Sequence, residues 1–289
     1  MGYRLGINLI RPTISKRAIL KKYDYWSWIM YRELIHIYGP FSIHSYGLMI
    51  FLGLIIAIIL MIRDPLRKQI ISKWQLLDSI SVMVLTGIIG ARILYLFCNI
   101  NYMSSVWDIV AVWDGGFSLM GSIIGILIVL PLYLTYFKIS VLPFFDVLAS
   151  YGALFEAIAR IGCLCAGCCY GKPTTAPWGI VYTDKSIDVP TDIYLHPTQL
   201  YSSFFLFVIF LIVILIGRRL YRKPGQLLMF YLILTGTERF LVDFFRGDRE
   251  FFGNNYFDVF SIHQYLALLV INMALFGFLV INKKQYEHI

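Results

Sequence analysis

The sequence predicts an all-α integral membrane protein with seven transmembrane helices, an N-terminus outside the cell and a cytoplasmic C-terminus. Two observations carry the class: the mean hydropathy is +0.72, and hydrophobic residues make up 59% of the chain against 15% charged residues. Soluble domains contain about 45–50% apolar and about 25% charged residues. A water-soluble chain this apolar could not cover its core with polar surface. Soluble, disordered, collagenous and coiled-coil proteins are therefore excluded.

Continuous apolar segments predict the helices themselves. A bilayer core about 30 Å thick takes roughly 20 residues of helix, and unbroken runs favour helices over a β-barrel. Residues 1–43 carry charges throughout and lack the apolar core of a signal peptide. We expect them to form an interfacial arm on the membrane surface, with surface helices, followed by one transmembrane domain over residues 44–289. The predicted spans are Ser45–Ile62, Leu76–Phe97, Phe117–Phe137, Leu142–Gly162, Pro197–Gly217, Gln226–Phe245 and Phe260–Ile281.

Basic residues in the loops predict the orientation. Cytoplasmic loops of membrane proteins carry an excess of Lys and Arg, and one set of loops here holds eleven basic residues against four in the other set. The larger set includes loops 63–75 and 218–225, which places the C-terminus inside. The seven basic residues of the N-terminal tail would then lie outside, where they could meet anionic lipid. The net charge of +8 thus indicates membrane orientation, and nucleic acid is not an expected partner.

Polar residues within the predicted spans gather at the outer level of the membrane. Ionisable groups inside spans are costly and mark functional sites, and this distribution predicts one polar cavity that opens at the outer half of the bilayer. A transporter is less favoured, because its sites lie near the midplane. The residues at this level include His44, Tyr46, Arg92, Tyr95, Ser118, Glu156, Arg160, His196, Gln199, Tyr201, Glu238, Arg239, Asp243, His263 and Gln264.

Three arginines at this level indicate an anionic ligand. Arg92, Arg160 and Arg239 each end a predicted span on the outer side. Arginine keeps its charge and forms paired contacts with phosphate, so a phospholipid head group is the expected ligand. The alternative interpretation is that charges four residues apart on a helix, such as those of Arg239 and Asp243, form ion pairs that only stabilise the fold.

Four of the five cysteines lie within seven residues, at Cys163, Cys165, Cys168 and Cys169. Four metal ligands from so short a stretch would be strained, and the spacing differs from the paired motifs of zinc ribbons. Metal binding and a redox role stay open as alternatives. We favour small apolar packing at a helix end, and we expect no metal and no cofactor.

Several motifs, taken in order along the chain, resemble the bacterial prolipoprotein diacylglyceryl transferase family. The resemblance runs from residue 44 to about residue 265. The motifs are His44-Ser-Tyr46-Gly47, Gly90-Ala-Arg92-Ile-Leu-Tyr95, Trp113-Asp-Gly115-Gly116-Phe-Ser118, Arg160-Ile-Gly162 with Gly167 and Tyr170-Gly171-Lys-Pro173-Thr174, His196-Pro197-Thr198-Gln199-Leu200-Tyr201, Gly236 with Arg239-Phe240, Asp243-Phe-Phe-Arg246, and Gln264.

The resemblance implies a multi-pass protein of the bacterial inner (cytoplasmic) membrane. It implies transfer of the diacylglyceryl group of phosphatidylglycerol to the lipobox cysteine thiol in a prolipoprotein signal peptide, with a thioether as product. The implied catalytic residues are Tyr46, Arg160, His196, Arg239 and Asp243. The implied phosphatidylglycerol-binding residues are Arg92, Ser118, Gly121, Arg160, Arg239 and Gln264.

The sequence departs from the family pattern at a position of chemical importance. Met120 stands where the family usually has a histidine, and the cysteine-rich stretch replaces two amides and a carboxylate. A thiol reacts as its thiolate, so another group must take the proton: His44, His196, Glu238 or Asp243. Two alternatives follow, a phospholipid-dependent transferase with a non-protein acceptor, and a non-catalytic lipid-binding or redox membrane protein.

Overall fold

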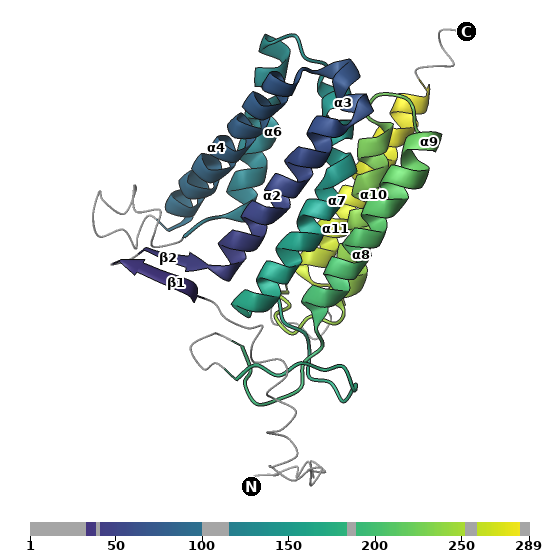
Figure 1. The fold of residues 1–289 in the computed structure, drawn as a ribbon. Coiled ribbons are helices and arrows are strands. Elements are labelled where there is room, and N and C mark those ends of the chain that lie inside the picture. The colour runs from purple at the N-terminus through teal and green to yellow at the C-terminus, as the bar shows by residue number, and fades with distance from the viewer. Residues whose placement is uncertain (1–32, 39–40, 100–115, 184–188, 252–258, 284–289) are drawn as a thin grey trace, which may run out of the picture.

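A computed structural model describes residues 33–38, 41–99, 116–183, 189–251 and 259–283 of the chain. Within these ranges all seven predicted apolar segments are helical, and they lie roughly side by side as a bundle (Figure 1). The helices are α2 (Ser45–Arg63), α3 (Pro65–Ile70), α4 (Lys73–Cys98), α6 (Leu119–Tyr136), α7 (Val141–Ala166), α8 (Thr198–Ile212), α9 (Arg218–Leu220), α10 (Gln226–Asp243) and α11 (Ile262–Lys283).

Six helical segments among the described residues are long and apolar enough to cross a membrane. They include the continuous run Thr198–Leu220, in which the π-helical turn η4 (Val213–Gly217) joins α8 to α9. The remaining long helix, α10, carries Glu238, Arg239 and Asp243 within its last six residues. The structure is therefore that of a mainly helical integral membrane protein, and a seventh span stays a prediction.

Side chains that cap the backbone decide where several helices begin and end. Ser72 and Gln75 form a reciprocal capping box at the start of α4, which satisfies two otherwise unpaired N–H groups. Ser118 caps α6 by accepting from the Gly121 N–H at 3.4 Å. At the other terminus of a helix, Gly167 ends α7 in the left-handed conformation (φ 70°), which glycine adopts without steric cost.

Glycines bring α4 and α6 into close contact. A Cβ atom on Gly121 would lie 2.3 Å from the Gly90 carbonyl oxygen, and one on Gly87 would lie 3.2 Å from Ile126. Small residues let helix backbones approach closely in membranes, and Gly87 and Gly90 supply such a face on α4. Gly121 belongs to the same contact.

A β-hairpin precedes the first span, where we expected surface helices. Strand β1 (Glu33–Tyr38) pairs antiparallel with β2 (Phe41–His44), with Glu33 opposite His44. The sequence Glu33-Leu-Ile-His-Ile-Tyr38 is rich in β-branched and aromatic residues, which favours strand over helix. The basic residues and tryptophans of the tail before Glu33 lie outside the described residues.

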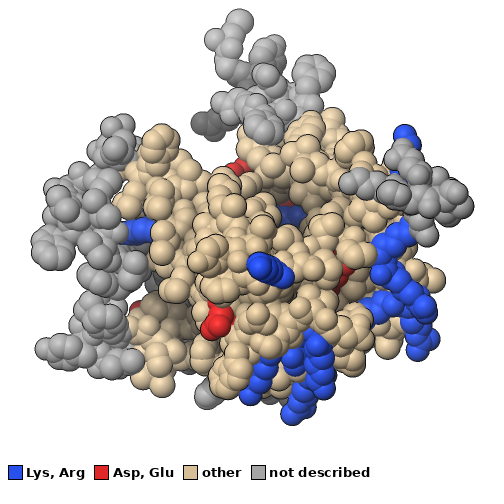
Figure 2. All heavy atoms as spheres, turned by 90° about the horizontal axis from the view of Figure 1, so that it is seen from above, with Lys and Arg blue, Asp and Glu red and all other residues tan. Residues whose placement is uncertain are grey.

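The two ends of the bundle differ in charge. The face seen from above in Figure 2 carries more Lys and Arg than Asp and Glu, and the segments that follow α2, α6 and α9 belong to this end. An ion pair stabilises it: Arg218 donates to both carboxylate oxygens of buried Asp64, at 3.2 and 2.5 Å. The same carboxylate caps α3 at the Leu66 N–H. The polar residues predicted for the outer level lie at the opposite end (Figure 1).

We expect Gly121→Ala to destabilise the protein by about 1–3 kcal/mol, because overpacking forces the two backbones apart. The measurement is the melting temperature of the purified protein in detergent, read from helical circular dichroism. Gly47→Ala is the matched control, since a Cβ there meets nothing within 4 Å. Equal melting temperatures for the two variants would contradict the close α4–α6 contact.

Candidate functional site

The polar end of the bundle collects residues from five helices. The first turns of α2, α8 and α11 and the last turns of α7 and α10 all lie at this end, and the segment between α7 and α8 lies beyond them (Figure 1). Isolated bridges hold that segment: Ile180 pairs with Leu195 within it, and Gly171 pairs with Arg246, which follows α10. The structure thus brings to one end of the bundle residues from Ser45 in α2 to Ile262 in α11.

Arg160 and Arg239 come close enough to interact electrostatically. Arg239 lies within electrostatic range of Arg246 and of Arg160; Arg246 is three residues past the end of α10. Arg246 is only 6% exposed and donates to both carboxylate oxygens of Asp248, at 2.8 and 2.6 Å. We call Arg160, Arg239 and Arg246 the arginine cluster. Sequence reasoning quoted Arg246 in a motif but did not place it in the site; its position directly after a span that ends in Arg239 and Asp243 was the available signal.

The cysteine-rich segment folds back against the end of α7. Gly167 and Cys169 both have left-handed backbones, with φ of 70° and 59°, and these two reversals return the chain to Cys163. The Sγ atoms of Cys163, Cys168 and Cys169 lie within 4.8 Å of one another. We call these three residues the cysteine trio. Cys165 is not part of it, although the sequence places all four together.

The arginine cluster and the cysteine trio are neighbours. The Nη1 atom of Arg160 lies 4.0 Å from Cys169 Sγ. Arg239 and Arg246 are also electrostatically coupled to Cys169. A negative group placed here would therefore lie near Arg160 and in the electrostatic field of Arg239 and Arg246.

The first turn of α8 fixes the backbone of the cysteine trio. Thr198 Oγ1 donates to the Cys169 carbonyl at 2.7 Å, and Gln199 Nε2 donates to the Cys168 carbonyl at 2.7 Å. Gln199 also donates to the hydroxyl of buried Tyr182 at 3.1 Å. Burial raises the pKa of Tyr182, so this phenol stays neutral. These contacts give the His-Pro-Thr-Gln motif a positioning role.

His196 faces an aromatic group rather than a carboxylate. Its Nδ1 lies 3.1 Å from the Tyr201 hydroxyl, which also accepts from Trp178 Nε1 at 2.7 Å. The ring packs edge-on against Phe245 at 5.4 Å. The sequence predicted His196 and Tyr201 at this end, and the structure brings them into contact.

Tyr46 lies beside the trio at the start of α2. Its backbone contacts Gly162 of α7, where a Cβ would lie 3.3 Å from Tyr46 Cα. Its side chain is 43% exposed and is electrostatically coupled to Arg160 and to all three cysteines of the trio. Tyr46 is thus an accessible polar group next to both clusters.

Asp243 and Gln264 lock the end of α10 to the start of α11. The Asp243 carboxylate is fully buried and accepts from Ser261 Oγ at 2.5 Å and Arg249 Nε at 3.1 Å. Gln264 accepts from Arg249 Nη2 at 2.6 Å and donates to the Phe240 carbonyl at 3.2 Å. Arg239 approaches the other Asp243 oxygen only to 4.0 Å. Asp243 and Gln264, both predicted site residues, therefore fix the position of α10, the helix that carries Arg239.

Two further carboxylates lie deeper in the bundle. Glu238 accepts from Ser202 Oγ at 2.6 Å and is electrostatically coupled to Arg160 and Arg239. Glu156 accepts a hydrogen bond from the Tyr231 hydroxyl. These contacts place two carboxyl groups near Arg160.

Arg92, Ser118 and Gly121 belong to the α4–α6 pair. Arg92 donates to the Gly116 carbonyl at 3.1 Å and lies over the rings of Tyr95 and Phe117. Ser118 caps α6 and Gly121 packs on Gly90. These neighbours differ from those of Arg160 and Arg239, so the structure pairs two of the three predicted arginines. The Trp113-Asp-Gly115 part of the nearby motif lies outside the described residues.

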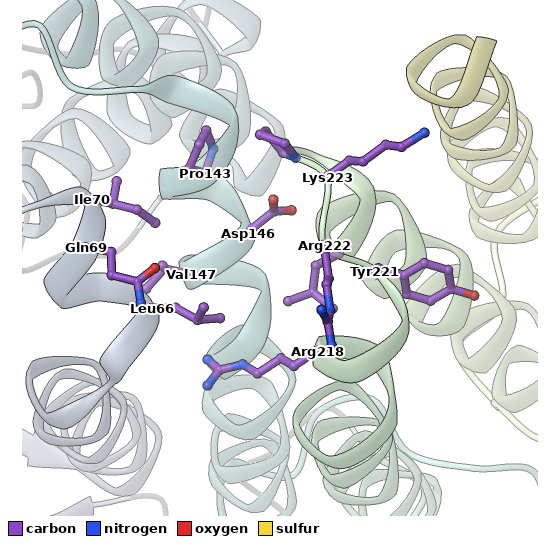
Figure 3. Close-up of a pocket in the computed structure, with 12 residues that line it drawn as sticks. Leu66, Gln69, Ile70, Pro143, Asp146, Val147, Arg218, Tyr221, Arg222 and Lys223 are labelled. Carbon is purple, nitrogen blue, oxygen red and sulfur yellow. The ribbon is translucent and has the colours of Figure 1, made fainter. Parts of the chain in front are cut away.

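A cavity of about 370 Å³ opens at the opposite, basic end, between α3, α7 and α9 (Figure 3). Its polar lining serves the fold: Arg218 pairs with Asp64, and Asp146 accepts from the backbone N–H groups of Gly225 and Leu228 at 2.6 and 2.8 Å. The lining also holds Arg222 and Lys223, but it contains no cysteine, so it differs from the polar end, where arginines and cysteines lie together.

Comparison with known proteins identifies the family. The family model described as prolipoprotein diacylglyceryl transferase matches residues 32–280. A Clostridium tetani protein named phosphatidylglycerol–prolipoprotein diacylglyceryl transferase is 34% identical over 245 residues, covering 85% of this chain and 95% of the relative. A Thermotoga maritima protein of the same name is 28% identical over 258 residues, covering 86% of this chain and 84% of the relative. The chain belongs to the prolipoprotein diacylglyceryl transferase family.

Proposed function

We propose that this protein transfers the diacylglyceryl group of phosphatidylglycerol to the lipobox cysteine thiol of a prolipoprotein signal peptide. The observation that carries this assignment is the arginine cluster beside an accessible polar face, in a chain whose relatives bear that activity in their names. The thiol displaces glycerol phosphate from the glyceryl carbon, so a thioether forms and a C–O bond breaks.

The arginine cluster fits the demands of this displacement. Negative charge grows on the phosphate as it leaves, and preorganised positive charge in a water-poor site stabilises such a transition state. Arg160 and Arg239 are the candidates for phosphate contacts, with Arg246 as a third charge whose guanidinium is fixed by Asp248. Arg92 is a candidate for guiding the lipid along the α4–α6 pair.

The proposed placement is a seven-span protein of the bacterial cytoplasmic membrane, with its N-terminus outside. The basic end of the bundle then faces the cytoplasm and the polar end faces outward, in keeping with the loop charges (Figure 2). α10 completes the set of seven: it is packed against α7, α8 and α11, so its charged residues need not face lipid. Both acceptor and donor lipid would reach the site from the outer leaflet.

The candidate bases are engaged to different degrees. Asp243 accepts from Ser261 and Arg249 and is fully buried, and Glu238 accepts from Ser202 deep in the bundle. We assign both of them positioning roles. His196 and Tyr46 lie closer to the accessible face, and we assign Tyr46 to orienting the acceptor.

We expect the purified protein to convert a lipobox peptide to its diacylglyceryl form when phosphatidylglycerol is supplied. Arg160→Ala or Arg239→Ala should reduce the rate by about 10²–10³-fold, because each variant removes one preorganised charge that stabilises the transition state. Mass spectrometry of the peptide measures the product. Arg219→Ala, an exposed arginine of the basic end, is the matched control. No product from folded wild-type protein, or full rates in both site variants, would overturn the assignment.

We expect Gln199→Leu to lower the transfer rate because the Cys168 carbonyl loses its donor, and to cost about 1–3 kcal/mol for the buried acceptor left unpaired. Rates and melting temperatures are measured together. Gln69→Leu, at an exposed position of the basic end, should change neither quantity. An unaltered rate in Gln199→Leu would show that this positioning contact is dispensable.

A further inference from the structure

The cysteine trio has the spacing of a thiolate metal site. A zinc–sulfur bond is about 2.3 Å long, so thiolates around a tetrahedral zinc ion lie about 3.8 Å apart. The three Sγ atoms lie within 4.8 Å of one another. An inward shift of about 1 Å or less would bring all three onto one tetrahedral ion.

The backbone that presents these thiols is fixed from outside the segment. Cys169 adopts a left-handed φ of 59°, which non-glycine residues keep only where the surroundings enforce it. Thr198 and Gln199 supply that constraint through the carbonyls of Cys169 and Cys168. The sequence argued against metal because four ligands from seven residues would be strained. The structure needs only three, and its two chain reversals remove that objection.

The surrounding charges favour a site rich in thiolates. Arg160 lies 4.0 Å from Cys169 Sγ, and Arg246 is electrostatically coupled to the same sulfur. Three thiolates around a divalent cation carry a net negative charge, which these guanidinium groups offset. Soft thiolate donors select zinc over magnesium or calcium.

The trio is also open on one side. Cys163 is buried, whereas Cys168 is exposed. Within the described residues the group of closely placed metal-ligating side chains consists of these three cysteines alone. Zinc sites that hold three protein ligands and one free position are typical of catalysis. Here the free position would face the region of Tyr46 and the arginine cluster.

We propose that Cys163, Cys168 and Cys169 bind a zinc ion whose fourth position takes the acceptor thiol of the substrate. This proposal rests on the proposed transfer. It supplies a means of deprotonating the acceptor thiol in a chain that has Met120 where a histidine was expected. A thiol bound to zinc is deprotonated, so the ion replaces a general base.

The step balances without any redox change. The acceptor S–H bond breaks as its sulfur binds zinc, and the sulfur electron pair then attacks the glyceryl carbon of phosphatidylglycerol. The C–S bond forms, and the C–O bond to phosphate breaks with its electron pair on the departing oxygen. The thiol proton ends on that phosphate, which the arginine cluster holds. Zinc leaves the thioether and returns to its three-cysteine state.

The first experiment measures zinc in the full-length protein purified in detergent under reducing conditions without chelators. We expect about one zinc ion per chain, lost in Cys163→Ser, Cys168→Ser and Cys169→Ser and retained in Cys165→Ser and Cys98→Ser. Gel filtration and circular dichroism verify that each variant is folded. Absence of zinc from wild type that also fails to take up added zinc would overturn the proposal, as would full retention by the trio variants.

The second experiment replaces zinc with cobalt in wild-type protein and needs no variant. A lipobox peptide with its cysteine should shift the visible cobalt bands, whereas the same peptide with serine should not. An unchanged spectrum at saturating cysteine peptide would overturn the assignment of the acceptor to the metal. Neither readout requires phosphatidylglycerol, so a protein that binds zinc and peptide thiol but makes no product would contradict the proposed transfer alone.

Discussion

Mutual repulsion among three guanidinium groups is the constraint around which the polar end of this bundle is organised. Arg160, Arg239 and Arg246 are held near one another at the end of apolar helices, where water screens their charges poorly. Asp248 neutralises Arg246 directly. One carboxylate oxygen of Asp243 lies 4.0 Å from Arg239 Nη2. The other oxygen accepts hydrogen bonds from Ser261 and Arg249. The cluster therefore retains positive charge that an anionic head group can satisfy.

The surrounding structure keeps the cluster from relaxing. The lock formed by Asp243, Gln264 and Arg249 ties α10 to α11, so the turn carrying Arg239 cannot swing toward solvent. Glu238 and Glu156 place carboxylates on the inner side of Arg160. Preorganised charge of this kind costs no reorganisation when a substrate charge develops. The contacts that join α10 to α11 therefore also hold Arg239 in place for the proposed reaction.

Much of the fold could be predicted from sequence, because each helix is a continuous apolar run and each polar outlier lies near a helix end. Arg92, Arg160 and Arg239 were grouped on that basis, and the structure brings Arg160 and Arg239 together. The β-hairpin was missed because its first strand is only six residues long and follows directly on the charged tail. The separate surroundings of Arg92 and the selection of three cysteines from four depend on packing and on two left-handed residues, which no periodicity reveals. Gly121 was predicted to bind lipid, and its contact with Gly90 shows how one small residue serves helix packing.

The hydrogen bonds from Thr198 and Gln199 make the spacing of the sulfur atoms depend on the distance between the end of α7 and the start of α8. Cys163 moves with the last turn of α7, whereas the carbonyls of Cys168 and Cys169 are held by the first turn of α8. A change in the separation of these two helix ends would therefore change the spacing of the sulfur atoms. The separation of α7 from α8 and the distances between the three sulfur atoms thus depend on each other.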